Sequence, residues 1–176
     1  MTSTSGTGRA SLDSGFGFRQ LEDIAVKAMS PSINDPVTAA HAVGHMADPL
    51  VRLTGCRLGP TLHRDDDGIG RAIVPDRDLR YYLDLSSAQL RRFAADEPSV
   101  LIALLRMLRA VAIACRDADQ SRDVLRSARL VAAQVPSGTT EADRCTVADM
   151  LARVERALNS DVVDAFSDRA GETRSI

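Results

Sequence analysis

The sequence predicts a mainly α-helical single domain, a bundle of six to seven helices with one small β-hairpin near residues 57–74. Three observations support this fold class. Apolar residues recur at helical spacing along most of the chain. Aromatic residues make up 3% of the 176 residues and Trp is absent, so an aliphatic, Ala-rich core is expected, which favours helices. An Asp-Gly turn between two short apolar runs indicates the hairpin.

The domain layout follows from composition. Residues 1–14 contain mainly Ser, Thr and Gly and very little apolar surface, so we expect a disordered leader. This segment also lacks the apolar middle region of a secretory signal. The folded domain is expected over residues 15–170, and residues 171–176 are expected to form a polar, disordered tail.

The first two helices are predicted on either side of a Pro-bounded turn. Leu21, Ile24, Ala25 and Ala28 have the spacing of a buried helical stripe, which predicts a helix from about Phe16 to before Pro31. Asp followed by Pro is typical of a helix start, so a second helix is expected from Pro36. Its inward residues are expected to be Val37, Ala40, Val43, Ala47 and Leu50. Pro49 predicts either a kink near Asp48 or a stop and a new start with Asp48 as cap.

The middle of the chain predicts the hairpin and a third helix. Leu62 and the run 69–74 flank the Asp-Gly turn at residues 65–68, which indicates two short strands. Pro75-Asp76 is expected to open the third helix. One face of that helix is predicted to carry Leu79, Tyr82, Leu83, Ser86, Leu90 and Phe93.

Four more helices are predicted towards the C-terminus. Glu97-Pro98 opens a fourth helix with the most hydrophobic face in the chain, so we expect it at the centre of the bundle. A fifth is expected over 121–135. A sixth over 140–159 begins with the capping pattern Thr140-x-x-Asp143. A short seventh helix is expected from 160 to about 169.

Composition also limits the function. The net charge is −2 and Arg alternates with Asp and Glu, which argues against a general nucleic-acid surface. The three cysteines lie far apart and form no Cys-x-x-Cys pair, so a reducing cytoplasm is expected. The apolar runs are far shorter than the ~20 residues that span a bilayer. The familiar phosphate-loop and nucleophile motifs are absent from the sequence, and we expect no cofactor.

The leading candidate site is the Asn34-Asp35 pair at the start of the second helix. Free N–H groups and the positive dipole end of a helix can hold an anion, with Arg19 and Thr38 as further ligand-binding candidates. An Asp before a Pro is also what helix capping alone requires. Both readings of the corner remain open from the sequence.

Two weaker hypotheses concern a metal and an interface. His41 and His45 are four residues apart with Asp48 one turn on, a geometry able to hold Zn²⁺, but the pattern lacks the Glu of His-Glu-x-x-His and we expect no bound metal. Phe16, Phe18 and Leu21 surround Arg19 and are candidates for an interface within the chain or with another subunit. The interface candidates are thus Phe16, Phe18 and Leu21, and the metal candidates are His41, His45 and Asp48.

The run from Phe16 to Ala39 carries a family resemblance. It reads FGFRQLEDIAVKAMSPSINDPVTA, and it resembles the signature of a family of predicted bacterial membrane proteins, domain of unknown function 2254. The similarity extends more loosely over residues 13–158. The chain departs from the family pattern at Ser32, Gly44 and Pro49. The resemblance implies a soluble, cytoplasmic-side C-terminal domain, associated with the membrane only through helices absent from this chain, and it implies no reaction.

Two functional hypotheses follow. The first is a non-catalytic regulatory or protein-interaction domain that forms a homo-oligomer or binds a protein partner. The second is a small hydrolase-like enzyme domain that binds a ligand or anion with Arg19, Asn34 and Asp35. A solvent-open pocket where these three side chains converge would favour the enzyme, whereas an apolar patch around Phe16 would favour assembly.

Overall fold

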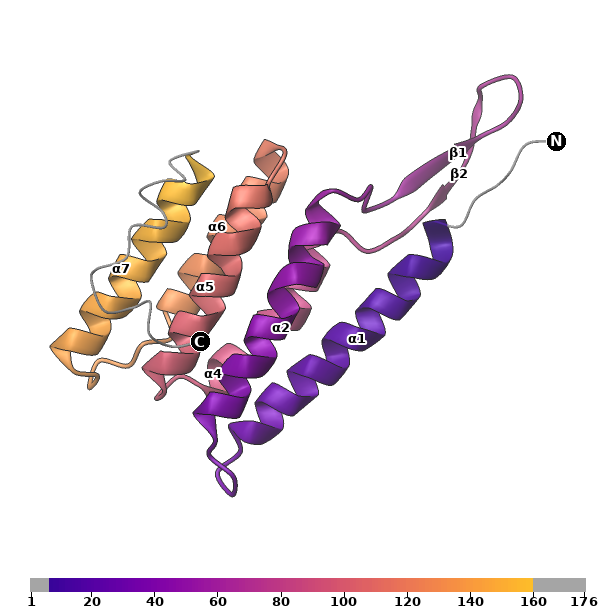
Figure 1. Cartoon of the computed structure of the whole chain (residues 1–176). Helices are drawn as coiled ribbons and strands as arrows, with labels where there is room; N and C mark the ends of the chain where they lie inside the picture. The colour runs from indigo at the N-terminus through magenta and orange to yellow at the C-terminus, as the bar shows by residue number, and fades with distance from the viewer. Residues whose placement is uncertain (1–6, 160–176) are drawn as a thin grey trace.

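The computed structural model describes residues 7–159 and confirms a mainly α-helical bundle with one antiparallel hairpin (Figure 1). The two strands pair only with each other and project from one end of the helical body. The elements in chain order are α1 Thr7–Ala28, α2 Pro36–Thr54, β1 Thr61–Arg64, β2 Gly70–Val74, α3 Leu79–Ser87, α4 Leu90–Phe93, α5 Pro98–Ala114, α6 Ala118–Ala132 and α7 Glu141–Leu158.

The first helix begins earlier than predicted. α1 starts at Thr7, so residues 7–14 are helical although they were expected to belong to a disordered leader. The C-terminal half of α1 is packed and nucleates the helix. Each further residue then adds one hydrogen bond when it becomes helical, so extension is easier than nucleation. Composition alone does not reveal this effect. The predicted seventh helix at 160–169 and the tail at 171–176 lie outside the described residues.

The second helix begins as predicted and continues past its internal proline. Asp35 is the N-cap and Pro36 the first helical residue. α2 runs as one helix to Thr54, so the alternative of a new start at Asp48 is wrong. Pro49 has no N–H to donate to the backbone carbonyl one turn earlier. Because Pro49 is exposed, that carbonyl can bind water instead. Val37 was expected inside but is 63% exposed.

The hairpin has the predicted Asp-Gly turn. Leu62 pairs with Ile73, and the register shifts between His63 and Arg64. At the turn the Ile69 backbone N–H donates to the Asp65 carboxylate at 2.8 Å. Most side chains of both strands are exposed, so the hairpin adds little to the core.

The third helix differs from the prediction at both ends. It begins at Leu79, with Asp78 rather than Asp76 as its cap. It ends at Ser87, and after Ala88 and Gln89 the chain forms the separate four-residue helix α4. Phe93 therefore does not share the buried face of α3 and is exposed.

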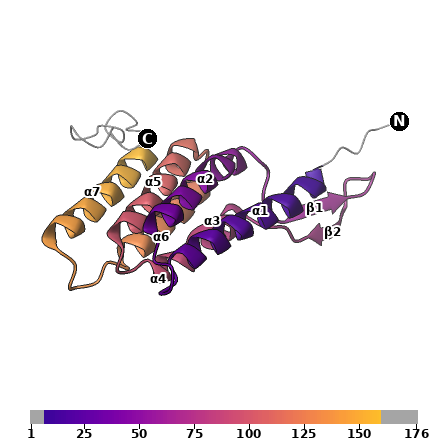
Figure 2. The same cartoon turned by 60° about the horizontal axis from the view of Figure 1, so that its bottom comes forward.

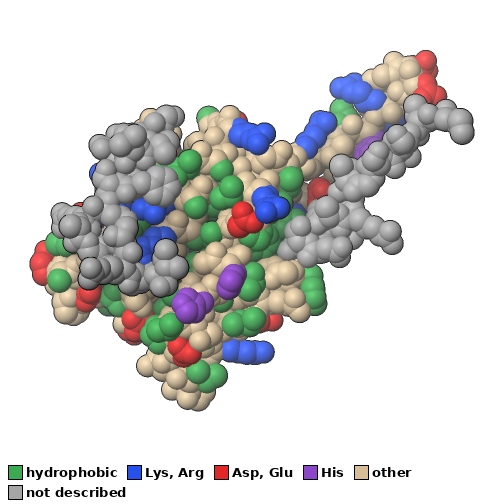
Figure 3. All heavy atoms as spheres, viewed as in Figure 1, with side chains coloured by type: hydrophobic (Ala, Val, Ile, Leu, Met, Phe, Trp, Pro, Cys, Tyr) green, Lys and Arg blue, Asp and Glu red, His purple; other side chains and the backbone are tan. Residues whose placement is uncertain are grey.

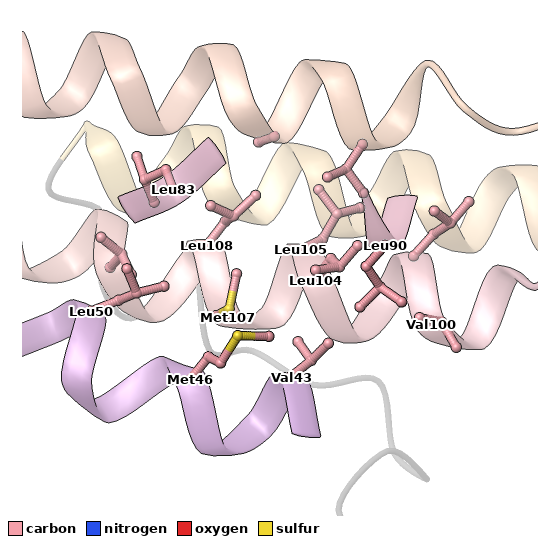
Figure 4. Packing of buried hydrophobic residues seen from close by; sticks show 14 of the residues in the cluster. Val43, Met46, Leu50, Leu83, Leu90, Val100, Leu104, Leu105, Met107 and Leu108 are labelled. Atoms are coloured by element: carbon pink, nitrogen blue, oxygen red, sulfur yellow. The ribbon is translucent and has the colours of Figure 1, made fainter. Parts of the chain in front are cut away.

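The core surrounds α5, as its apolar face predicts. α5 packs against α2, α6 and α7, and Figure 4 shows leucine, valine and methionine side chains of α2, α3, α4 and α5 meeting there. α6 begins at Ala118, three residues before the predicted start, with Asp117 as cap. α7 follows the predicted capping pattern, because the Asp143 N–H donates to the Thr140 hydroxyl at 3.2 Å.

Candidate functional site

The turn between α1 and α2 explains why Asn34 is present. Its backbone φ is +47°, a left-handed conformation that Asn tolerates better than most residues. Its N–H donates to the Ser30 carbonyl at 2.9 Å, and the next N–H, of Asp35, donates to the Ala28 carbonyl at 2.7 Å. The backbone of the corner is thus held by local hydrogen bonds, and Asn34 has a conformational role there.

The Asp35 carboxylate is used within the helix start. One oxygen accepts the Thr38 N–H at 3.0 Å and the other accepts the Thr38 hydroxyl at 2.6 Å. These side-chain and backbone hydrogen bonds lower the pKa of Asp35 below its ordinary 3.8. Asp35 and Thr38, two of the four predicted ligand-binding residues, are therefore hydrogen-bonded to each other.

Arg19 lies away from this corner. It is nine residues before the end of α1, which is about 13 Å along a helix axis. Its guanidinium donates to the Tyr81 hydroxyl at 3.0 Å and so links α1 to α3. The structure therefore does not assemble Arg19, Asn34 and Asp35 into one polar pocket, which is the arrangement that the enzyme hypothesis requires.

The predicted metal ligands lie on the exposed face of α2. His41 and His45 are both exposed, and Asp48 forms an ion pair with Arg52 at 3.0 Å. Within residues 7–159, no three His, Cys, Asp or Glu side chains are grouped closely enough to hold a metal ion.

The three predicted interface residues divide between surface and core. Phe18 is only 2% exposed and packs on Tyr82 of α3, with ring centroids 5.6 Å apart, so its contact lies within the chain. Leu21 is half-buried, whereas Phe16 is 62% exposed. Phe18 and Leu21 also line an open, largely apolar groove of about 320 Å³, together with Gly17, Pro49, Arg52, Leu53 and Cys56.

Sequence reasoning missed the burial of ionisable groups, and Glu22 and Arg91 are examples. Glu22 is only 8% exposed, and burial raises its pKa above 4.5. Its spacing from Phe18 and Ala25 places it in the buried stripe of α1, and this signal was available in the sequence. Arg91 on α4 is partly buried, and burial lowers its pKa. No sequence pattern indicated this position.

Comparisons with known proteins agree with the resemblance. The family model described as "Predicted membrane protein (DUF2254)" matches residues 4–110. Uncharacterized proteins of Mycobacterium tuberculosis and Mycobacterium bovis are 38% identical over 141 residues, which is 78% of this chain and 27% of theirs. The chain thus spans about a quarter of the length of these relatives. No solved structure matches. None of the helices within residues 7–159 is long and apolar enough to cross a bilayer.

Proposed function

The chain belongs to the family of predicted membrane proteins that contain domain of unknown function 2254, and we propose that it is a non-catalytic, self-associating interaction domain of such a protein. We place this domain on the cytoplasmic side of the membrane. Its task is to bring copies of the protein together or to bind a regulatory protein partner.

The observation that carries the proposal is the exposed apolar surface of the α1–α2 hairpin. Four large apolar side chains of this hairpin are about half or more exposed. Figure 3 shows hydrophobic side chains on this part of the molecule, interspersed with charged groups and histidines. Such residues bury apolar area when a partner covers them. The four are Phe16, Ile24, Ile33 and Val37.

The polar corner supports a role without catalysis. A catalytic carboxylate needs access to a substrate proton, whereas both oxygens of Asp35 accept hydrogen bonds from Thr38. Arg19 is held by Tyr81 on another helix. Asp35 is thus used to cap α2, and Arg19 is used to join α1 to α3.

Size-exclusion chromatography with light scattering tests self-association. We expect the wild type to elute as a dimer or larger assembly, and Phe16→Ser to shift it towards the monomer because an exposed aromatic contact is lost. Phe93→Ser is the matched control, since Phe93 is also exposed but lies on α4. Circular dichroism would check that both variants keep their helical content. Clean monomers for both wild type and Phe16→Ser at high protein concentration would contradict the proposal.

A further inference from the structure

Arg91 carries a positive charge that this part of the chain does not neutralise. It lies on α4, at one end of the bundle (Figure 2). Its Nε and Nη1 atoms are buried and, within residues 7–159, have no hydrogen-bond partner. The residue as a whole keeps part of its surface exposed to solvent.

Asp84, the carboxylate whose charge acts on Arg91, already forms ion pairs with two other arginines. One oxygen of Asp84 lies 3.0 Å from Nη1 of Arg126, and the other lies 3.9 Å from Nε of Arg80. Arg91 is close enough to Asp84, Arg92 and Arg126 for their charges to affect it, yet it forms no ion pair with Asp84.

The same region contains further carboxylates. Asp123 on α6 interacts electrostatically with Arg80, Arg122 and Arg126, and also with Asp78. Arg122 in turn pairs with Asp119 at 2.7 Å. The carboxylates of this region are therefore already shared among other guanidinium groups, and Arg91 remains without an acceptor.

The missing acceptor should be an anion. Buried donors without a partner are costly, and a guanidinium group does not lose its proton to avoid that cost. A phosphate group offers more acceptor oxygens than a carboxylate and matches the forked geometry of Arg. We propose that Arg91, assisted by Arg126, binds a phosphate group, either free in solution or in a lipid headgroup. This inference is independent of self-association through α1 and α2.

Titration with inorganic phosphate tests the site directly. We expect phosphate to raise the thermal unfolding midpoint of the wild type at constant ionic strength, because the anion binds the folded state. Arg91→Met keeps the apolar stem and removes the donors, and we expect it to weaken phosphate binding at least about tenfold by calorimetry. Arg92→Met, at the adjacent exposed position, should bind phosphate like the wild type.

A second arm distinguishes the two sources of phosphate. Wild type, Arg91→Met and Arg92→Met would be sedimented with phosphatidylcholine vesicles, with and without about 20% phosphatidic acid. Sedimentation that requires both phosphatidic acid and Arg91 would support a lipid headgroup. Phosphate binding that requires Arg91 without vesicle binding would support a free phosphate. Equal behaviour of wild type and Arg91→Met in both assays would overturn the proposal.

Discussion

Glu22 is a carboxyl group held almost out of water in the contact between α1 and α4. It is accessible over only 8% of its surface, and the Gln89 backbone just before α4 gives it a hydrogen bond. Burial is the largest cause of its raised pKa, and the charge of Asp23 acts in the same direction. Arg19 and the Gln89 hydrogen bond oppose the shift without cancelling it. The ionised form of Glu22 is therefore less favourable in the folded protein than in the unfolded chain.

We predict that Glu22→Gln stabilises the protein at neutral pH. The pKa of Glu22 is 4.5 in the unfolded chain and higher in the folded protein. Between these two pKa values the folded state binds more protons than the unfolded state. The free energy of unfolding of the wild type therefore falls as pH rises through this range. The amide has no charge to bury and can still accept the hydrogen bond. The gain should be fully present above the folded pKa and should shrink as pH falls towards 4.5.

Urea unfolding at several pH values between 4 and 8 would measure this effect, with Asp66→Asn, at an exposed position in the hairpin turn, as the control. A Glu22→Gln protein that is less stable than the wild type at pH 7 would show that the carboxylate is better satisfied than we infer.

Residue chemistry also explains which parts of the candidate site were predictable. Asn34, Asp35 and Thr38 are neighbours in sequence, so the hydrogen bonds of the helix start could be anticipated from local rules. The bond between Arg19 and Tyr81 joins residues 62 positions apart, and local rules contain no information about it. The sequence therefore predicted one possible site for these polar residues. In the structure Asp35 and Thr38 lie at the start of α2, whereas Arg19 lies in the contact between α1 and α3.

At the scale of elements, α3 packs against α6, and both helices bury serine side chains. Ser86 and Ser87 of α3 are fully buried, and each hydroxyl donates to a carbonyl one turn earlier, at 2.7 Å. Ser127 of α6 is equally buried, but its hydroxyl has no partner within the described residues. These serines thus differ in hydrogen bonding and not in burial.

We predict that Ser127→Ala leaves stability unchanged or raises it by up to about 1 kcal/mol, because a buried hydroxyl without a partner is removed. Ser86→Ala should instead lower stability by about 1 kcal/mol, because a hydrogen bond is lost at the same burial. Urea midpoints of the two variants would be compared at pH 7. Equal destabilisation would mean that the Ser127 hydroxyl has a partner in solution.

Element boundaries were predictable at cap residues that a second local residue marks, as Pro36 marks Asp35 and Asp143 marks Thr140. Asp35 and Thr140 are such residues, and both cap as predicted. Before α3 the chain offers both Asp76 and Asp78, and a long-range bond decides between them. The Gly59 N–H donates to the Arg77 carbonyl at 3.0 Å, which ties residue 77 to the base of the hairpin and moves the helix start to Leu79.

At the scale of the whole molecule, stability is concentrated in the helical bundle. Leu104 lies on the central helix α5 and is fully buried, whereas Leu62 lies on the projecting hairpin and is exposed. Because a two-stranded ribbon contributes little stability by itself, the bundle should unfold as one unit that scarcely depends on the hairpin.

We predict that Leu104→Ala destabilises the protein by about 2–5 kcal/mol, through lost apolar burial and a cavity in the core around α5. Leu62→Ala removes the same atoms from an exposed position and should change stability by less than about 0.5 kcal/mol. Urea unfolding followed at 222 nm would compare the two. A large effect of Leu62→Ala would indicate that the hairpin is covered in solution by another surface.

The sequence by itself determined the helical class, the Asp-Gly hairpin, the central place of α5 and the family. These properties depend on periodicity, turn chemistry and a contiguous motif, all of which act between near neighbours in the chain. Only the tertiary structure decided that Phe18 packs on Tyr82, that Arg19 binds Tyr81 and that Arg91 lacks an acceptor. Each of these depends on which distant segment covers a side chain, and that is set by the packing of the whole bundle.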